Sequence, residues 1–122
     1  MLNLSKSRKR IRNGQNNNAR RMPMQNCIDY IISSKNINAE LIRQEVSFLQ
    51  ETLDNLRNRG IISNDSYLDA GAIEGGLGML ANLIELGIPI EEVHEHLRQL
   101  RERASRIDGA HPSLGPAVAA SR

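Results

Sequence analysis

Acid–base or metal-binding chemistry is best sought in one polar cluster, Glu91, His94, Glu95 and His96. On a helix, Glu91, His94 and Glu95 share a face because they are three or four residues apart. His94 and His96, however, point roughly 200° apart, and no Cys or Asp cluster joins them. The spacing therefore predicts a solvated polar helix face, with no metal site and no catalytic residue.

Two further patterns could indicate chemistry. Cys27, the single cysteine, falls on an apolar helical stripe with no base beside it, which is typical of a small core residue rather than a nucleophile. Residues 76–81, GLGMLA, match the glycine spacing of dinucleotide-binding turns, but no strand precedes them. Close packing between helices explains these glycines better. We therefore expect no cofactor and no enzyme activity.

The residue types that would have to position any site predict an all-α fold. The chain has 122 residues with one Phe, two Tyr and no Trp, so aliphatic side chains must build the core. The β-branched and aromatic runs that mark strands are absent. We expect one domain, a small bundle of about four helices over residues 23–108.

Apolar spacing and capping residues place the four helices. The first is predicted from residue 24 to about 33 or 34, and the second from 39 to 59, between a cap at Asn38 and a left-handed Gly60. The third runs from the turn at 63–66 to residue 86. Its glycines, at 71, 75, 76 and 78, either break it or let another helix approach closely. The fourth starts at Pro89 and ends near 108–109, and residues 109–122 are expected to form a flexible tail.

The fourth predicted helix carries an apolar seam with spacings of three and four residues. Such a seam is typical of coiled-coil pairing, so we expect a homodimer held by this seam. The side chains predicted to mediate self-association are Ile90, Val93, Leu97, Leu100 and Ile107. Burial of the same seam inside an intramolecular bundle is the alternative.

The corner before the fourth helix carries a local family resemblance. Residues 83–97, LIELGIPIEEVHEHL, resemble the second helix pair of the mercury-resistance (MerR-type) transcription regulators, in which a leucine-glycine turn precedes a helix that opens with two glutamates. Residues 59–63, RGIIS, resemble the segment after that family's recognition helix. The resemblance covers about residues 80–99 and 59–63, and it implies a winged-helix, dimeric, DNA-binding regulator. The alternative is a generic helix corner, because Gly87 and Pro89 suit any tight connection of this kind.

Charge is unevenly distributed along the chain. Of sixteen basic and fourteen acidic residues, residues 1–22 hold seven basic and no acidic ones, which leaves nine basic against fourteen acidic, about −5, for residues 23–122. The low apolar content of residues 1–22 predicts a disordered basic arm. Its cations can neutralise phosphates and release counterions, and its lack of aromatic residues favours duplex DNA over single strands. The residues predicted to bind nucleic acid are Lys6, Arg8, Lys9, Arg10, Arg12, Arg20 and Arg21.

These observations predict a non-enzymatic nucleic-acid-associated protein, a regulator or an accessory DNA-binding factor. The alternative is a protein-interaction adaptor or assembly component whose arm docks on an acidic protein partner and whose glycine-rich third helix lies against another chain. A cytoplasmic location is expected because no secretory signal is recognisable. We expect no membrane association, because residues 70–87, the longest apolar region, contain Glu74, Asn82 and Glu85.

Overall fold

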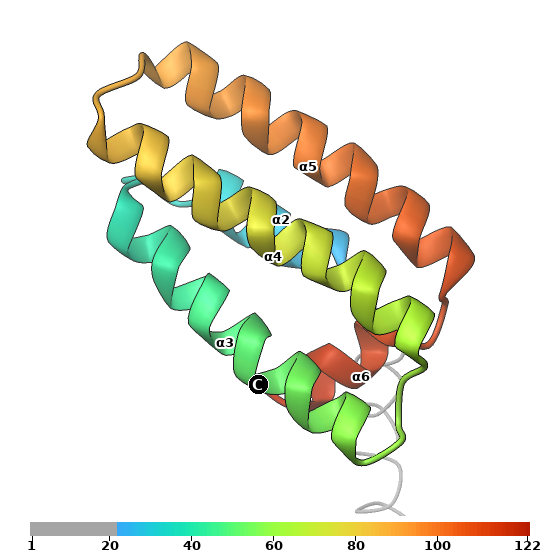
Figure 1. Cartoon of the computed structure of the whole chain (residues 1–122). Coiled ribbons are helices and arrows are strands. Elements are labelled where there is room, and N and C mark those ends of the chain that lie inside the picture. Colours follow the sequence, from blue (N-terminus) through green and yellow to red (C-terminus); the bar gives the residue numbers. More distant parts are fainter. Residues whose placement is uncertain (1–21) are drawn as a thin grey trace, which may run out of the picture.

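The computed structural model describes residues 22–122, and it is helical without strands over that range (Figure 1). The helices are α2 (Gln25–Ile32), α3 (Ala39–Asn58), α4 (Asn64–Glu85), α5 (Ile90–Ala110) and α6 (Leu114–Ala120). The predicted all-α small bundle is therefore confirmed, with one helix more than expected in the described part.

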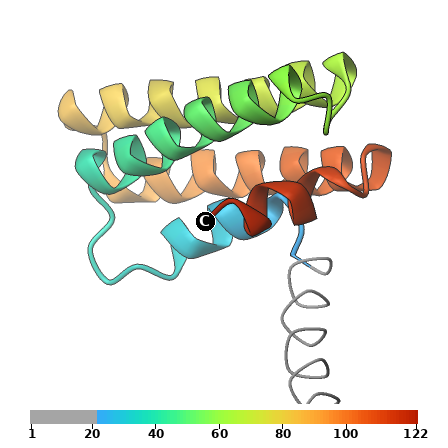
Figure 2. The same ribbon diagram turned by 90° about the horizontal axis from the view of Figure 1, so that it is seen from below.

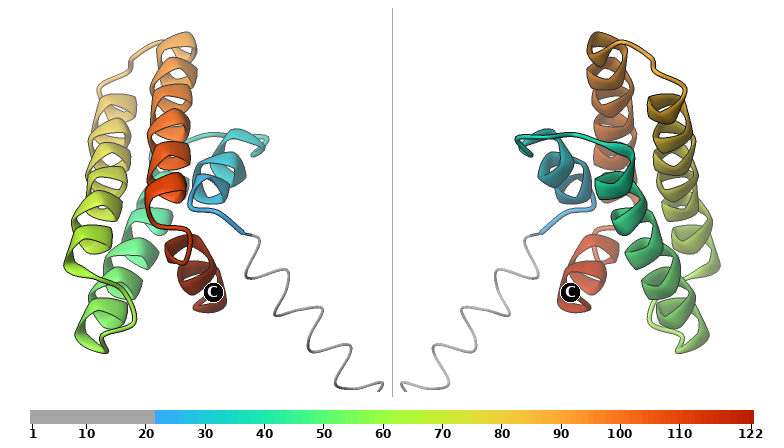
Figure 3. Two further views of the ribbon diagram at one scale, coloured as in Figure 1. Left: turned by 90° about the vertical axis from the view of Figure 1, so that its right-hand side faces the viewer. Right: turned by 90° about the vertical axis from the view of Figure 1, so that its left-hand side faces the viewer.

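The three long helices determine the shape of the body. Helices α3, α4 and α5 run alternately up and down, with α4 between the other two in Figure 1. Seen from below, α2 and α6 lie beneath the layer that α3 and α4 form (Figure 2). The two side views also place α2 and α6 on the side away from α4 (Figure 3). One face of α4 thus packs on the core, while its opposite face points to solvent.

Local capping chemistry sets the ends of α3 as predicted. The Asn38 side chain accepts a hydrogen bond from the Leu41 backbone N–H at 2.9 Å. At the other end, Gly60 has a φ of 73°, in the left-handed region that glycine adopts without steric strain. The Ile61 N–H then donates to the Leu56 carbonyl at 2.9 Å, which completes a Schellman turn.

The corner between α4 and α5 repeats this design. Gly87 has a φ of 89°, and the Ile88 N–H donates to the Leu83 carbonyl at 3.3 Å. Pro89 occupies the N-cap position with φ −61° and ψ 150°, one residue before the first helical position that was predicted for it. Because α3 is one uninterrupted helix, the arrangement is typical of a bundle rather than of a helix-turn-helix. The resemblance to MerR-type regulators itself stays a prediction.

An aliphatic core joins all five helices. Its large side chains with less than 2 % exposure include Ile28, Ile31, Leu49, Leu53, Ile73, Leu77, Leu80, Leu97 and Leu114. Burial of each such side chain contributes about 1.5–3 kcal/mol relative to leaving it in water. The core therefore follows the aliphatic composition, as predicted.

The predicted self-association seam on α5 is part of this core. Val93, Leu97, Leu100 and Ile107 are all buried within one chain, and Ile90 alone among the five predicted residues is exposed, at 49 %. The expectation that these side chains hold a homodimer together is wrong for the four buried ones, because α2 and α4 already cover them. Spacings of three and four residues serve an intramolecular bundle as well as a coiled coil.

The predicted flexible tail over residues 109–122 is also wrong. Helix α5 continues to Ala110, and α6 then buries Leu114 and Val118 in the core. At Gly115, an added Cβ would lie 2.6 Å from the Met22 carbonyl oxygen, so glycine lets α6 pack directly on that backbone. The segment contains too few large apolar residues for a helical period to be recognised.

Candidate functional site

The predicted nucleic-acid-binding residues lie outside the described part of the chain. All seven, Lys6, Arg8, Lys9, Arg10, Arg12, Arg20 and Arg21, precede residue 22. The structure does define where the arm joins the body, at residues 22–25 beside α6 (Figure 3). We call residues 22–25 the root of the arm.

The root of the arm is fixed by a carboxylate from the far end of α5. The two carboxylate oxygens of Asp108 accept hydrogen bonds from the backbone N–H groups of Met24, at 2.6 Å, and Gln25, at 3.1 Å. These N–H groups open α2 and have no partner inside that helix. An acid at this position also interacts favourably with the positive end of the helix dipole. Asp108 thus caps α2 from another helix.

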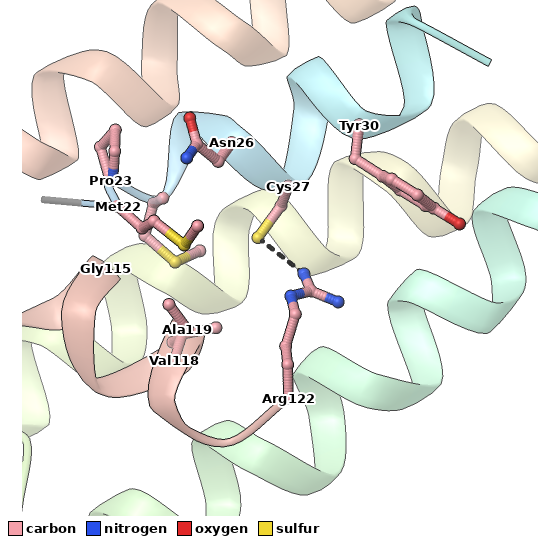
Figure 4. Close-up of a pocket in the computed structure, with 10 residues that line it drawn as sticks. Met22, Pro23, Asn26, Cys27, Tyr30, Gly115, Val118, Ala119 and Arg122 are labelled. Atoms are coloured by element: carbon pink, nitrogen blue, oxygen red, sulfur yellow. Dashed lines mark hydrogen bonds between the residues drawn. The ribbon is translucent and has the colours of Figure 1, made fainter. Parts of the chain in front are cut away.

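A cavity of about 350 Å³ opens between α2 and α6 (Figure 4). Its lining is mainly apolar and includes Met22, Pro23, Met24, Tyr30, Val118 and Ala119. Cys27 and Arg122 supply polar atoms, and the Arg122 guanidinium donates to the Cys27 sulfur at 3.3 Å. Burial, together with the nearby Glu45 carboxylate, raises the pKa of Cys27 to about 12. The thiol therefore stays protonated near neutral pH, which suits a core residue and not a nucleophile.

Glu45 provides a second buried polar group beside this cavity. Its side chain is only 4 % exposed and forms an ion pair with Arg122. The Arg122 guanidinium also lies 4.1 Å from the centroid of the Phe48 ring. Pairing offsets part of the cost of removing the carboxylate from water. Since no buried side-chain polar atom within residues 22–122 lacks a partner, these groups hold α6 against α3 and are not free for a ligand.

The polar cluster on α5 does not assemble into a site. Glu91, His94 and Glu95 are exposed, and Glu95 forms an ion pair with Arg98. His96 instead lines a shallow groove beside Met79 of α4. Within residues 22–122, no group of three or more His, Cys, Asp or Glu side chains is arranged to hold a metal ion.

The glycines of α4 serve two different purposes. At Gly76 an added Cβ would lie 2.6 Å from a terminal methyl group of Leu100, so this glycine lets α5 pack close to α4. This agrees with the predicted alternative in which the glycines let another helix approach closely. At Gly71, Gly75 and Gly78 an added Cβ would meet nothing within 4 Å. Packing inside the chain does not require glycine at these three positions. Each nevertheless costs about 1 kcal/mol relative to alanine in a helix interior.

The outward face of α4 carries no charged residue along its length. Three large apolar side chains project from it, Leu68, Met79 and Leu86, with exposures of 67 %, 65 % and 81 %. We define the α4 face as Asn64, Leu68, Gly71, Ala72, Gly75, Gly78, Met79, Asn82 and Leu86, which lie on one side of the helix at 100° per residue. This uncharged, exposed face is our candidate functional site.

Beside Ala72, the border of the α4 face toward α5 is basic. Arg103 and Arg106 line a groove with Ala72 of the α4 face. No ion pair within residues 22–122 involves either arginine. Asp69 also lines this groove, but its carboxylate is 2.8 Å from Nε2 of His111. We call Arg103 and Arg106 the basic border.

The border toward α3 is acidic near the middle of α4. The Asp54 carboxylate accepts a hydrogen bond from the Tyr67 hydroxyl at 2.6 Å. Burial and, to a smaller extent, the negative charge of Asp54 raise the pKa of Glu74. The Arg57 guanidinium stacks over the Tyr67 ring, 4.6 Å from the ring centroid. We call Asp54 and Glu74 the acidic border.

The adaptor alternative expected the glycine-rich helix to lie against another chain, but sequence reasoning did not identify which residues of that helix form its exposed side. A helical projection contains the missing signal, since Leu68, Gly75 and Leu86 fall together on the side opposite the buried Ile73 and Leu77. None of the described helices combines the length and apolar character needed to cross a membrane. Comparison of the chain with protein-family models, curated proteins and solved structures found no match.

Proposed function

We propose that the chain is a non-enzymatic nucleic-acid-associated protein, a regulator or an accessory factor, whose basic arm binds the phosphates of duplex DNA. The observation that carries this proposal is the separation of charge along the sequence. Residues 1–22 hold seven basic and no acidic residues, whereas residues 23–122 hold nine basic and fourteen acidic ones. A polyanion is therefore attracted to the arm and repelled by most of the body.

The chemistry of the body supports a binding role. Its most deeply buried polar groups, Glu45 and Cys27, are both engaged by Arg122, and the thiol is held in its protonated form. These contacts hold helices together and leave no paired nucleophile and base in the described cavity. A rigid body that carries a basic arm is an arrangement suited to charge-driven association.

The decisive experiment measures the affinity of the full chain for a labelled DNA duplex by fluorescence anisotropy as salt is raised. With about six phosphate contacts, the affinity should fall about 1,000-fold between roughly 50 and 200 mM salt. Removal of residues 1–21 should abolish binding while Met22 and its contact with Gly115 are kept. A second variant with glutamine at all seven arm cations keeps the length of the arm and should also lose binding.

Two outcomes would overturn this proposal. One is a full chain that fails to bind the duplex at low salt, and the other is an arm-free chain that binds as tightly as the full one. If the full chain ignores DNA but binds an acidic polypeptide such as polyglutamate with a similar salt dependence, the adaptor alternative is favoured. That alternative is supported by the uncharged, exposed α4 face with Leu68, Met79 and Leu86.

A further inference from the structure

The α4 face has the length and composition of a contact surface. A helix of 22 residues is about 33 Å long, and this one shows solvent an uncharged side in a chain with 25 % charged residues. Exposed apolar patches of this kind on soluble proteins mark interaction sites. Leu68 and Leu86, near its two ends, are 67 % and 81 % exposed.

The open glycines indicate what kind of surface covers this face. Gly71 and Gly75 are one helical turn apart, with nothing within 4 Å of the position of an added Cβ at either residue. Small residues at this spacing let the backbone of a second helix approach more closely than the usual 8–10 Å between axes. A second helix packed against these positions would offset the cost of the glycines to α4.

The charged borders indicate which helix that is. We infer that the α4 face binds the α4 face of a second copy of this chain, with the two helices parallel and a two-fold axis running along them. This axis places the basic border of each copy, Arg103 and Arg106, opposite the acidic border of the other, Asp54 and Glu74. The dimer therefore contains two equivalent contacts between a basic and an acidic border. A two-fold contact uses the same patch on both copies and therefore needs a patch that is complementary to itself.

Other symmetric arrangements of the same face lack this complementarity. If the two α4 helices were antiparallel, each basic border would lie along the basic border of the other copy. The parallel arrangement also brings Gly71 and Gly75 of both chains to the point of closest approach. Neither Asp54 nor Glu74 forms an ion pair within residues 22–122, so an arginine of a second copy could pair with either carboxylate without breaking an existing ion pair.

The inferred dimer goes beyond the proposed function, since it needs no nucleic acid. It leaves α2, α6 and the root of the arm on the outer side of each copy (Figures 2 and 3). Two arms on one particle would bind a long polyanion more tightly than one arm through effective concentration.

The first test blocks the close approach of the two α4 helices without disturbing the fold of the single chain. Gly75→Gln places a side chain where the single chain has open space, and the loss of a helix-weakening glycine favours α4. Sedimentation of the full chain in DNA-free buffer should show a wild-type dimer and a dimer Kd at least about 100-fold higher for the variant. Gly109→Gln is the matched control, because Gly109 is also an open helical glycine but lies on α5, and its Kd should match wild type.

The second test shows whether the charged borders of one copy meet those of a second copy. One variant carries Arg103→Glu and Arg106→Glu, and the other carries Asp54→Lys and Glu74→Lys. Each variant alone has like charges on both borders and should be monomeric at low salt. Their equimolar mixture should form a heterodimer, because every border then meets its opposite.

The dimer inference fails if the wild-type full chain sediments as a monomer at every concentration at which it is soluble. It also fails if Gly75→Gln associates as tightly as the Gly109→Gln control, or if the mixed charge variants stay monomeric. Deletion of residues 1–21 should leave association unchanged. If the deleted chain no longer associates, the arm supplies the contact and the inference fails. Because no DNA is present, these results are read separately from those that test the proposed function.

Discussion

Replacing Gly115 with alanine tests whether α6 docks as described. The added Cβ would lie 2.6 Å from the Met22 carbonyl oxygen and 2.7 Å from the Met24 nitrogen, whereas non-bonded heavy atoms settle about 3.5 Å apart or more. Both neighbours are backbone atoms, and Asp108 holds the Met24 N–H at 2.6 Å. No side chain can rotate out of the way, so α6 must move away from the root of the arm.

The magnitude follows from what that movement disrupts. A small shift costs about 1–3 kcal/mol through overpacking and about 1 kcal/mol through the strained Asp108 hydrogen bonds, while the helix propensity of alanine returns about 1 kcal/mol. Complete undocking would expose Leu114 and Val118, now 0 % and 2 % exposed, at about 3–6 kcal/mol for the two together. The chain takes the less costly route, so we expect a loss of about 1–3 kcal/mol.

The assay is thermal and urea unfolding followed by far-UV circular dichroism. For a body of this size, the expected loss lowers Tm by at least about 4 °C. Gly109→Ala is the matched control, since an added Cβ there meets nothing within 4 Å, and this variant should be as stable as wild type or up to about 1 kcal/mol more stable. A Gly115→Ala protein that unfolds at or above the temperature of Gly109→Ala would refute the described packing of α6.

The remaining predictions concern a thiol, a cap and the buried seam. Because its pKa is about 12 instead of 9.0, Cys27 should react with iodoacetamide about 1,000-fold more slowly in the folded chain than in the unfolded chain, as the thiolate is the reactive species. The unfolded thiol ionises above pH 9.0 while the folded one keeps its proton, so this contribution to stability is complete below that pH and is lost as the pH rises towards about 12. Urea unfolding as a function of pH should therefore show a shallower alkaline decline for Cys27→Ala, and identical profiles would contradict the raised pKa. Asp108→Ala should destabilise the body by about 1–2 kcal/mol and speed hydrogen exchange at the Met24 amide; unchanged exchange there would show that Asp108 is not the cap. Leu97→Glu should unfold the monomer, whereas the exposed Ile90→Glu should leave circular dichroism unchanged; a folded Leu97→Glu chain that only fails to associate would restore the α5 seam as an interface.

The features that the sequence predicted well are those that depend on neighbouring residues. The bounds of α3 followed from the side chain of Asn38 and the left-handed tolerance of Gly60, each of which acts within one helical turn. The aliphatic core followed from composition. These signals need no knowledge of which helix lies against which, so they survive in a single sequence.

The features that the sequence did not predict depend on which surfaces meet. The spacing of Leu97 and Leu100 is the same whether a helix of the same chain or of another chain covers them. The two core residues of α6, Leu114 and Val118, are too few to define a period. A helical projection groups the residues of the α4 face, but only the structure shows that nothing within the described body covers Gly75.

The bond between Asp108 and Met24 also bears on the order in which the chain folds. The two residues are 84 positions apart, whereas α3, α4 and α5 follow one another through short connections. Closing a long loop costs entropy before the contact is gained, so the hairpin of α3 and α4 should form early and the docking of α2 late. During synthesis α2 is complete well before its capping carboxylate exists. Its apolar residues Ile28 and Ile31 therefore stay exposed until α5 has been made and α2 can dock.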